Sequence, residues 1–142
     1  MKMTIPSKKI VRNHSLKLKK EKIGKETISY IQERADAFEV LGTLEPYRVG
    51  VEIYKWNKKQ LASGKVIAIV LRGPDSIAKV KDLVGPTYPS KAFAGTIRGS
   101  YSIDTVLLSG LEKRAIHNVV HRSSSMDEAE REISLWFKQK IS

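Results

Sequence analysis

Apolar residues recur every three or four positions in four stretches of the chain, and this spacing predicts four helices that each bury one face. The first stretch covers residues 27–35, and its helix could begin as early as Leu16. The second covers residues 47–61 and the third residues 75–84, with Gly85 as its stop. The last runs from a capping box formed by Ser125 and Glu128 to about Phe137.

Two shorter apolar runs predict strands. Residues 66–71 are continuously apolar and rich in β-branched side chains, which indicates a strand covered on both faces and central in its sheet. Residues 115–120 form a second, shorter run that ends at His121. Between them, residues 85–114 show no sustained periodicity, and an irregular stretch of this length inside a domain tends to be functional.

The composition fits one folded domain. The chain has 142 residues, 41% of them hydrophobic and 29% charged, and no apolar run approaches the roughly 20 residues of a membrane span. The first residues lack the apolar core of a secretory signal, so we expect a soluble, cytoplasmic protein that does not bind membranes. The absence of cysteine excludes disulfides and thiolate metal sites.

The net charge of +11 is concentrated at the start of the chain. Residues 1–25 hold nine lysines or arginines against one acid, which leaves +3 for all the rest. We therefore expect a basic arm over residues 1–22 and a globular domain over residues 23–142. A solvated or fraying end is the commoner explanation of such a run, and salt-dependent binding of nucleic acid through residues 1–25 is the alternative.

His121 stands where a predicted strand gives way to a helix N-terminus, and Arg122 with three serines fills the turn. Free amides, hydroxyls and the positive end of the helix dipole favour an anion such as phosphate at this place. A neutral imidazole nitrogen can act as a nucleophile and form a phosphoryl intermediate. A purely structural histidine is the alternative that the residues alone leave open.

Three further side chains could contact an anion. Arg98 lies between two glycines, and a guanidinium matches phosphate oxygens in pairs. Thr87 offers a hydroxyl on a proline-rich turn, and Lys81 projects from the last turn of the third helix. Taken singly, each of these residues has a simpler explanation. An arginine in a glycine-rich loop can be solvated, a threonine can stabilise a turn, and a lysine near a helix C-terminus interacts favourably with the helix dipole.

Taken in order, these motifs resemble the second half of nucleoside diphosphate kinases. The matching segments are Gly-Pro-Thr-Tyr-Pro from residue 85, Gly-Thr-Ile-Arg-Gly from residue 95, Asn-Val-Val-His-Arg-Ser-Ser-Ser from residue 118, and residues 128–137. The resemblance covers about residues 63–137, and residues 23–57 are similar to a longer variant of the family with extra helix. It implies a ferredoxin-like α/β fold that lacks the first strand-helix-strand unit.

The resemblance also implies a ping-pong transfer of phosphate between nucleoside triphosphates and diphosphates, with Mg²⁺ bridging phosphates and a homo-oligomer, tetramer or hexamer. His121 would be the nucleophile, Glu132 would orient its imidazole, and Ser123 would be a neighbouring hydroxyl. The residues expected to hold the nucleotide are Lys81, Thr87, Arg98 and Asn118.

The sequence departs from the family pattern in several places. The family's Lys-Pro-Asp segment occurs nowhere in this sequence, and Lys17, Lys19 or Lys20 could stand in for its lysine. The position that stacks a ring on the base falls on Ile53. Smaller departures are Lys65, Ser100, Arg122 and Ser124.

The missing first strand leaves three explanations: another chain supplies it, the N-terminus is incomplete, or the protein folds without it. A catalytically impaired relative that binds nucleotides or nucleic acid through its basic arm is the alternative function.

Overall fold

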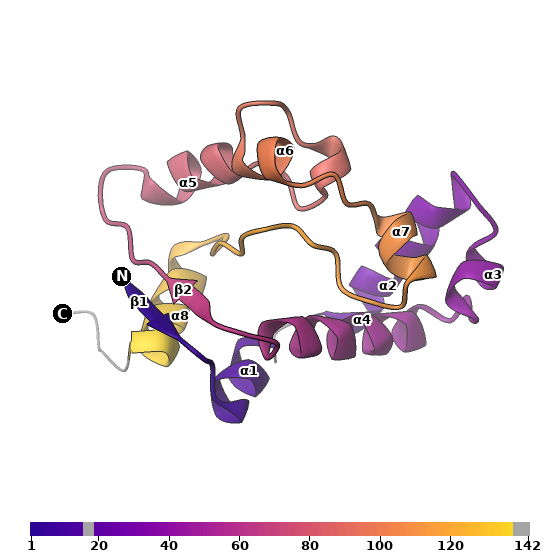
Figure 1. The fold of residues 1–142 in the computed structure, drawn as a ribbon, viewed down its shortest axis with the longest axis horizontal. Helices are drawn as coiled ribbons and strands as arrows, with labels where there is room; N and C mark the ends of the chain where they lie inside the picture. Colours follow the sequence, from indigo (N-terminus) through magenta and orange to yellow (C-terminus); the bar gives the residue numbers. More distant parts are fainter. Residues whose placement is uncertain (16–18, 138–142) are drawn as a thin grey trace.

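The computed structural model describes residues 1–15 and 19–137, in which a small antiparallel sheet is combined with helices of very different length (Figure 1). None of the helices in this part of the chain is long and apolar enough to cross a membrane. In chain order the elements are β1 (Lys2–Thr4), α1 (Lys8–Ser15), α2 (Lys20–Gln32), α3 (Ala37–Leu41), α4 (Pro46–Leu61), β2 (Val66–Ala68), α5 (Ser76–Val84), the 3₁₀ turn η1 (Pro89–Lys91), α6 (Ile97–Tyr101), α7 (Val106–Leu111) and α8 (Met126–Phe137).

Helices α2 and α4 pack so closely that their backbones touch, because each helix has a glycine where the backbone of the other approaches. A Cβ atom on Gly24 would lie 1.8 Å from the carbonyl oxygen of Pro46, and one on Gly50 would lie 1.9 Å from that of Lys20. No side chain fits into either space. The close approach brings Ile28 of α2 and Val49 of α4 into the same core.

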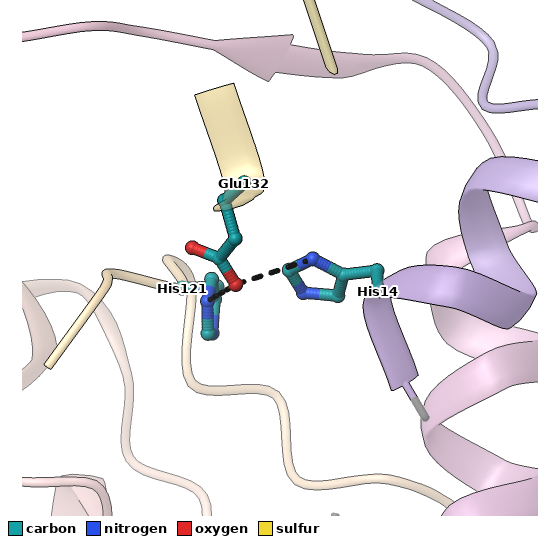
Figure 2. Close-up of side chains that lie close together, drawn as sticks. All are labelled: His14, His121 and Glu132. Atoms are coloured by element: carbon teal, nitrogen blue, oxygen red, sulfur yellow. Dashed lines mark hydrogen bonds and ion pairs between the residues drawn. The ribbon is translucent and has the colours of Figure 1, made fainter. Parts of the chain in front are cut away.

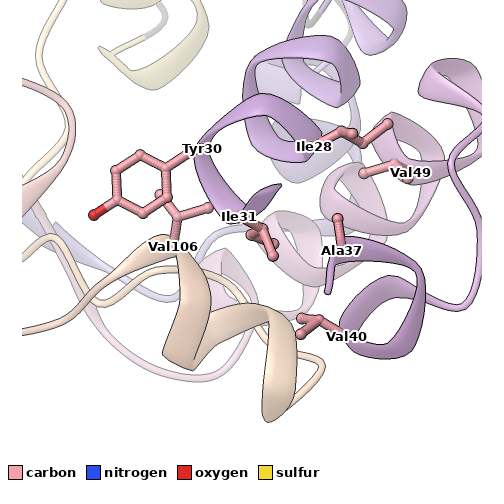
Figure 3. Packing of buried hydrophobic residues seen from close by; sticks show 7 residues of the cluster. All are labelled: Ile28, Tyr30, Ile31, Ala37, Val40, Val49 and Val106. Atoms are coloured by element: carbon pink, nitrogen blue, oxygen red, sulfur yellow. The ribbon is translucent and has the colours of Figure 1, made fainter. Parts of the chain in front are cut away.

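The hydrophobic core lies where α2, α3, α4 and α7 meet (Figure 3). Ile31 is fully buried at its centre, and α7 contributes Val106 from a distant part of the sequence. The core residues are Ile28, Tyr30, Ile31, Ala37, Val40, Val49 and Val106. The predicted first helix supplies three of these seven residues, although it ends at Gln32 and its suggested start at Leu16 lies outside the described residues.

The other three predicted helices are confirmed with small shifts of their ends, as α4, α5 and α8. Helix α3 follows α2 after a short turn and was not predicted. The carboxylate of Asp36 caps it by accepting hydrogen bonds from the amides of Phe38 and Glu39, and Gly42 ends it with a φ of 77°.

The prediction of a central, doubly covered strand over residues 66–71 is wrong. Only Val66–Ala68 is a strand, and it pairs with β1 at the register Lys2 to Ala68 and Thr4 to Val66. Ile67, Ile69 and Leu71 are each more than half exposed. The apolar run correctly predicts a strand, but it wrongly predicts that the strand is central in a sheet. Among the described residues, β1 is the one strand that pairs with β2.

Residues 85–114 are not wholly irregular, as had been expected. They contain η1, α6 and α7, the longest of which has six residues. The hydroxyl of Thr96 accepts from the amide of Gly99, and that of Thr105 accepts from the amide of Leu108. These local caps start helices that are too short to show an apolar period.

The predicted strand over residues 115–120 is also absent, because side chains satisfy its backbone instead of a neighbouring strand. The amide of His117 donates to the carboxylate of Asp104. The hydroxyl of Ser102 donates to the carbonyl of His117, and the guanidinium of Arg98 donates to the carbonyls of Asn118 and Val120. Buried backbone groups need partners, and here the side chains supply them.

The basic start of the chain is folded against the body. β1 pairs with β2, and α1 packs against both α4 and α8 with Val11 and Ser15 buried. A solvated or fraying end is therefore the wrong explanation for residues 2–15. The division of the chain at residue 22 stays a prediction.

Candidate active site

His121 lies in the irregular segment before α8, and its imidazole meets a carboxylate from the second turn of that helix (Figure 2). His121 Nε2 is 3.0 Å from Glu132 Oε1. The hydroxyl of Ser123 donates to the other carboxylate oxygen, Oε2, at 2.6 Å. The structure thus brings together the three residues that the sequence singled out as catalytic.

The carboxyl of Glu132 is held in its ionised form. Burial by itself would raise its pKa, but the hydrogen bond and charge of His121 and the hydrogen bond from Ser123 outweigh it, and the pKa of Glu132 is lowered. An ionised carboxylate can only accept hydrogen bonds, so Nε2 of His121 carries the proton. The lone pair of the neutral ring is then on Nδ1, which is the nitrogen available as a nucleophile.

The turn before α8 is built by serine side chains. The amide of Glu128 donates to Ser125 Oγ at 3.2 Å, which confirms one half of the predicted capping box. The returning half differs by one residue, because Glu128 Oε2 accepts from the amide of Ser124 at 2.7 Å and not from that of Ser125. This turn fixes the direction in which α8 presents Glu132 to His121.

A second histidine, His14 from α1, completes the cluster and was missed by sequence reasoning. Its ring meets that of His121 edge to face, with the ring centres 4.6 Å apart and the planes at 83°. Its Nδ1 lies 3.4 Å from Glu132 Oε1 and 3.4 Å from the indole nitrogen of Trp136. No signal in the sequence points to His14, since it lies in the run that was interpreted as a basic arm.

His14 is best described as a neutral ring. Burial, together with the nearby charge of His121, lowers the pKa of His14, and the opposing influence of Glu132 is smaller. A neutral ring with its proton on Nε2 leaves Nδ1 free to accept from the indole N–H of Trp136. Trp136 thereby fixes the orientation in which His14 faces Glu132.

The cluster opens onto a cleft of about 900 Å³. Thr87 and Asn118, two of the residues expected to hold a nucleotide, line this cleft together with His121 and Glu132. Ile53, the residue at the expected base position, lies on its wall near Trp56. A volume of this size accommodates a ligand as large as a nucleotide.

Arg98 lies behind the cleft wall, not within it. The side chain is 4% exposed, and its guanidinium donates to the carbonyls of Gly85, Pro86, Asn118 and Val120 at 2.6–3.2 Å. Four of its five N–H groups are used in this way. Burial and the nearby Arg122 lower the pKa of Arg98. In this structure Arg98 braces the loops that carry Thr87 and Asn118.

The remaining expected residues do not join the cluster. Lys81 is exposed on α5 and does not line the cleft. Of the three stand-in lysines, Lys17 lies outside the described residues, Lys19 is exposed, and Lys20 places its ammonium over the ring of Tyr54. The cation that does reach the cluster is Arg131, whose Nη2 is 3.6 Å from Glu132 Oε1 and which sequence reasoning did not select.

Comparison with known proteins gives a consistent result. The family model for nucleoside diphosphate kinase matches residues 47–141. A nucleoside diphosphate kinase of Pyrobaculum aerophilum is 45% identical over 100 residues, which are 70% of this chain and 55% of that protein. One of Rhodococcus erythropolis is 39% identical over 112 residues, which are 78% of this chain and 73% of that protein. The chain thus spans little more than half of the Pyrobaculum relative.

Two solved structures share the fold. A crystal structure of an NDP kinase from Pyrobaculum aerophilum superposes with a TM-score of 0.84 at 38% identity, covering 96% of this chain and 76% of that one. A nucleoside-diphosphate kinase from Borrelia burgdorferi, described as a transition-state mimic with bound vanadate and ADP, gives 0.69 at 26% identity, covering 96% and 66%. The α/β fold class expected from the sequence is confirmed.

Proposed function

The chain belongs to the nucleoside diphosphate kinase family, and on that basis we propose that it transfers the γ-phosphoryl group of a nucleoside triphosphate to a nucleoside diphosphate through a phosphohistidine at His121. The observation that carries the proposal is the hydrogen-bonded set of His121, Glu132 and Ser123 at the edge of a cleft large enough for a nucleotide.

In the first half-reaction, Nδ1 of His121 attacks the γ-phosphorus. A P–N bond forms, the bond from phosphorus to the bridging oxygen of the β-phosphate breaks, and the nucleoside diphosphate leaves with that electron pair. Nε2 keeps its proton, and the positive charge that develops on the ring is balanced by Glu132 at 3.0 Å. Ser123 holds the same carboxylate in place from its other oxygen.

The second half-reaction reverses these steps with a different nucleotide. A terminal oxygen of the second diphosphate attacks the phosphorus, the P–N bond breaks, and its electron pair returns to Nδ1. Splitting the transfer into two in-line displacements needs positioning and charge neutralisation more than acid-base chemistry. The exposed side of His121, whose side chain is 55% accessible, leaves room for both nucleotides in turn.

For the nucleotide contacts we propose Thr87 and Asn118 as residues that touch it, since both line the cleft. A phosphate contact of Arg98 stays a sequence-based proposal, because in the structure its buried guanidinium holds the loops that carry Thr87 and Asn118. Lys81 stays a sequence-based proposal, because in the structure it is exposed on α5.

Magnesium fits this site as a partner of the nucleotide phosphates. Four carboxylates line the cleft, and each one has a partner in the structure. Glu132 is paired with Ser123 and His121, Glu128 with Ser124, Asp104 with Arg114 and Glu26 with Lys22, so they do not form an oxygen cage for the ion. Magnesium usually binds through few protein ligands plus substrate phosphates. When bound there it neutralises charge on the phosphates.

The comparisons do not support the alternative of a non-catalytic relative that binds nucleic acid. Binding of nucleic acid through residues 1–25, a homo-oligomer of four or six chains, and a cytoplasmic location stay predictions.

The experiment is to incubate the purified chain with γ-labelled ATP and magnesium and to measure acid-labile, base-stable label on the protein. We expect label on the wild type and none on His121→Ala. Transfer of the label to an added nucleoside diphosphate completes the reaction cycle. His117→Ala is the histidine control. His117 also lines the cleft, but its hydrogen bonds run through its backbone amide and carbonyl, so this variant should still take up label at His121.

Absence of label on wild-type protein that unfolds cooperatively would contradict the proposal. Equal labelling of the His121→Ala variant would show that another residue carries the phosphoryl group.

A further inference from the structure

We propose that His14, His121 and Glu132 together bind a divalent transition-metal ion of the zinc class. One nitrogen from each histidine and one carboxylate oxygen lie within 4.8 Å of one another (Figure 2). The three side chains come from α1, from the segment before α8, and from α8 itself. They converge on one point from separate directions, as ligands of a metal centre do.

The distances suit a tetrahedral ion. Bonds of about 2.0–2.1 Å to nitrogen and oxygen place neighbouring tetrahedral ligands about 3.3 Å apart. Glu132 Oε1 is 3.4 Å from His14 Nδ1 and 3.0 Å from His121 Nε2. The two separations bracket the expected value, so movements of a few tenths of an ångström are enough for the carboxylate. The set as a whole extends to 4.8 Å, so the two imidazoles must also move toward each other to bind one ion.

The chemistry of the donors selects the ion. Two imidazoles with one carboxylate form a ligand set that binds zinc with a fourth position open to water or substrate. Magnesium and calcium prefer oxygen ligands throughout, so this set discriminates against them. The exposed side of His121 faces the cleft, where a water molecule or a phosphate oxygen would take the fourth position.

Binding of the ion would replace interactions that the three side chains make in this structure. Binding of the ion displaces the proton on Nε2 of His121, and this proton moves to Nδ1 or to solvent. Binding also displaces the hydrogen bond from the indole of Trp136 to His14, which is long at 3.4 Å. Arg131, 3.6 Å from Glu132 Oε1, opposes the ion and limits its affinity.

A metal at this place would exclude phosphoryl transfer while it is bound. It takes over the oxygen of Glu132 that balances the charge of the His121 ring, and its own charge withdraws electrons from that ring. The binding itself does not rest on the proposed function, because a metal can be measured on a chain that transfers no phosphate.

The experiment titrates Zn²⁺ against the full chain, free of any histidine tag, in competition with a chromophoric chelator. We expect one equivalent of zinc bound by the wild type, with Mg²⁺ in large excess unable to displace it. His14→Ala, His121→Ala and Glu132→Gln should each raise the Kd by more than the roughly 10–100-fold that loss of an outer partner costs.

Two further variants keep the test decisive if a substitution unfolds the chain. His117→Ala removes the remaining histidine and should leave the Kd unchanged. His14→Cys replaces one zinc ligand with another and should keep the affinity that His14→Ala loses. The proposal is overturned by a wild type that binds no zinc, by His14→Ala binding as tightly as the wild type, or by His14→Cys binding as weakly as His14→Ala.

Discussion

Arg131 of α8 donates from Nη1 to the backbone carbonyl of Asn13 in α1, at 3.3 Å. Asn13 directly precedes His14, and Arg131 directly precedes Glu132. This contact therefore joins the two elements at the point where each one presents a residue to the His121 cluster. It is one of the contacts that hold α1 over the site, together with the packing of α1 against α4 and α8.

Replacing Arg131 with Gln should loosen α1. A long hydrogen bond from a partly exposed charged donor contributes about 1 kcal/mol, so amides of residues 8–15 should exchange with deuterium about fivefold faster. Native-state hydrogen exchange checks this. Arg48→Gln is the control, because Arg48 pairs with Glu45 on the exposed side of α4 and should not change exchange in α1. Unchanged exchange in Arg131→Gln would show that other contacts hold α1.

Glu132→Gln should slow phosphorylation of His121 by about 10²-fold or more, because an amide donates as well as accepts and no longer fixes the proton on Nε2. Rapid-quench labelling with γ-labelled ATP measures this rate. Ser123→Ala removes only the support of the carboxylate and should have a smaller effect. If the two variants were equally slow, the carboxylate would act through its position alone and not through its charge.

Arg98→Lys should destabilise the fold by at least about 3 kcal/mol, since an ammonium cannot reach four carbonyls and leaves buried oxygens unpaired. Urea unfolding followed by circular dichroism gives the free energy. Arg72→Lys, at an exposed position, is the matched control and should be neutral. A small effect in Arg98→Lys would mean that water replaces the guanidinium behind the cleft.

The carboxylate of Asp104 gives a pH-dependent contribution to stability. Burial raises its pKa, but Arg114 and the amides of His117 and Thr105 lower it further, so that it lies below the ordinary 3.8 in the folded chain. The unfolded chain therefore takes up the proton first as the pH falls. The contribution is fully present above pH 3.8 and is lost as the pH drops through the folded pKa.

Asp104→Asn should therefore cost about 1.5–3 kcal/mol at neutral pH, and this difference from the wild type should shrink below pH 4. Unfolding curves of both proteins at several pH values test it. A difference that stays constant down to the lowest pH would show that the packing of Asp104, not its charge, is what matters.

Gly50→Ala should destabilise the chain by about 3 kcal/mol or more, because the new Cβ would overlap the carbonyl oxygen of Lys20 and force α2 and α4 apart. Thermal unfolding measures the loss. Gly64→Ala is the matched control, since a Cβ there meets no atom within 4 Å, and it should be neutral or slightly stabilising.

The residues proposed as catalytic could be selected from the sequence because the resemblance to nucleoside diphosphate kinases covers a short segment that holds all of them. Glu132 lies only eleven residues after His121, and the predicted helix start at Ser125 falls between the two. The long helices α4 and α8 could be predicted because each carries its own apolar period.

Contacts that depend on distant residues could not be predicted. His14 meets Glu132 only because α1 packs against α8, and nothing near His14 in the sequence encodes that. The strand expected before His121 failed for a related reason, because Arg98 and Asp104 satisfy that backbone from elsewhere in the chain. An apolar run does not reveal which partner its amides will find.

The position of His14 near one end of the chain and Glu132 near the other has a consequence for synthesis. At roughly 5–20 residues per second, the ribosome releases Glu132 about 6–24 s after His14. During that interval α1 has no α8 to pack against, and His121, when it emerges, lacks its carboxylate. A nascent chain can therefore complete the cluster of His14, His121 and Glu132 only after α8 has been synthesised, so the cluster is absent from shorter nascent chains.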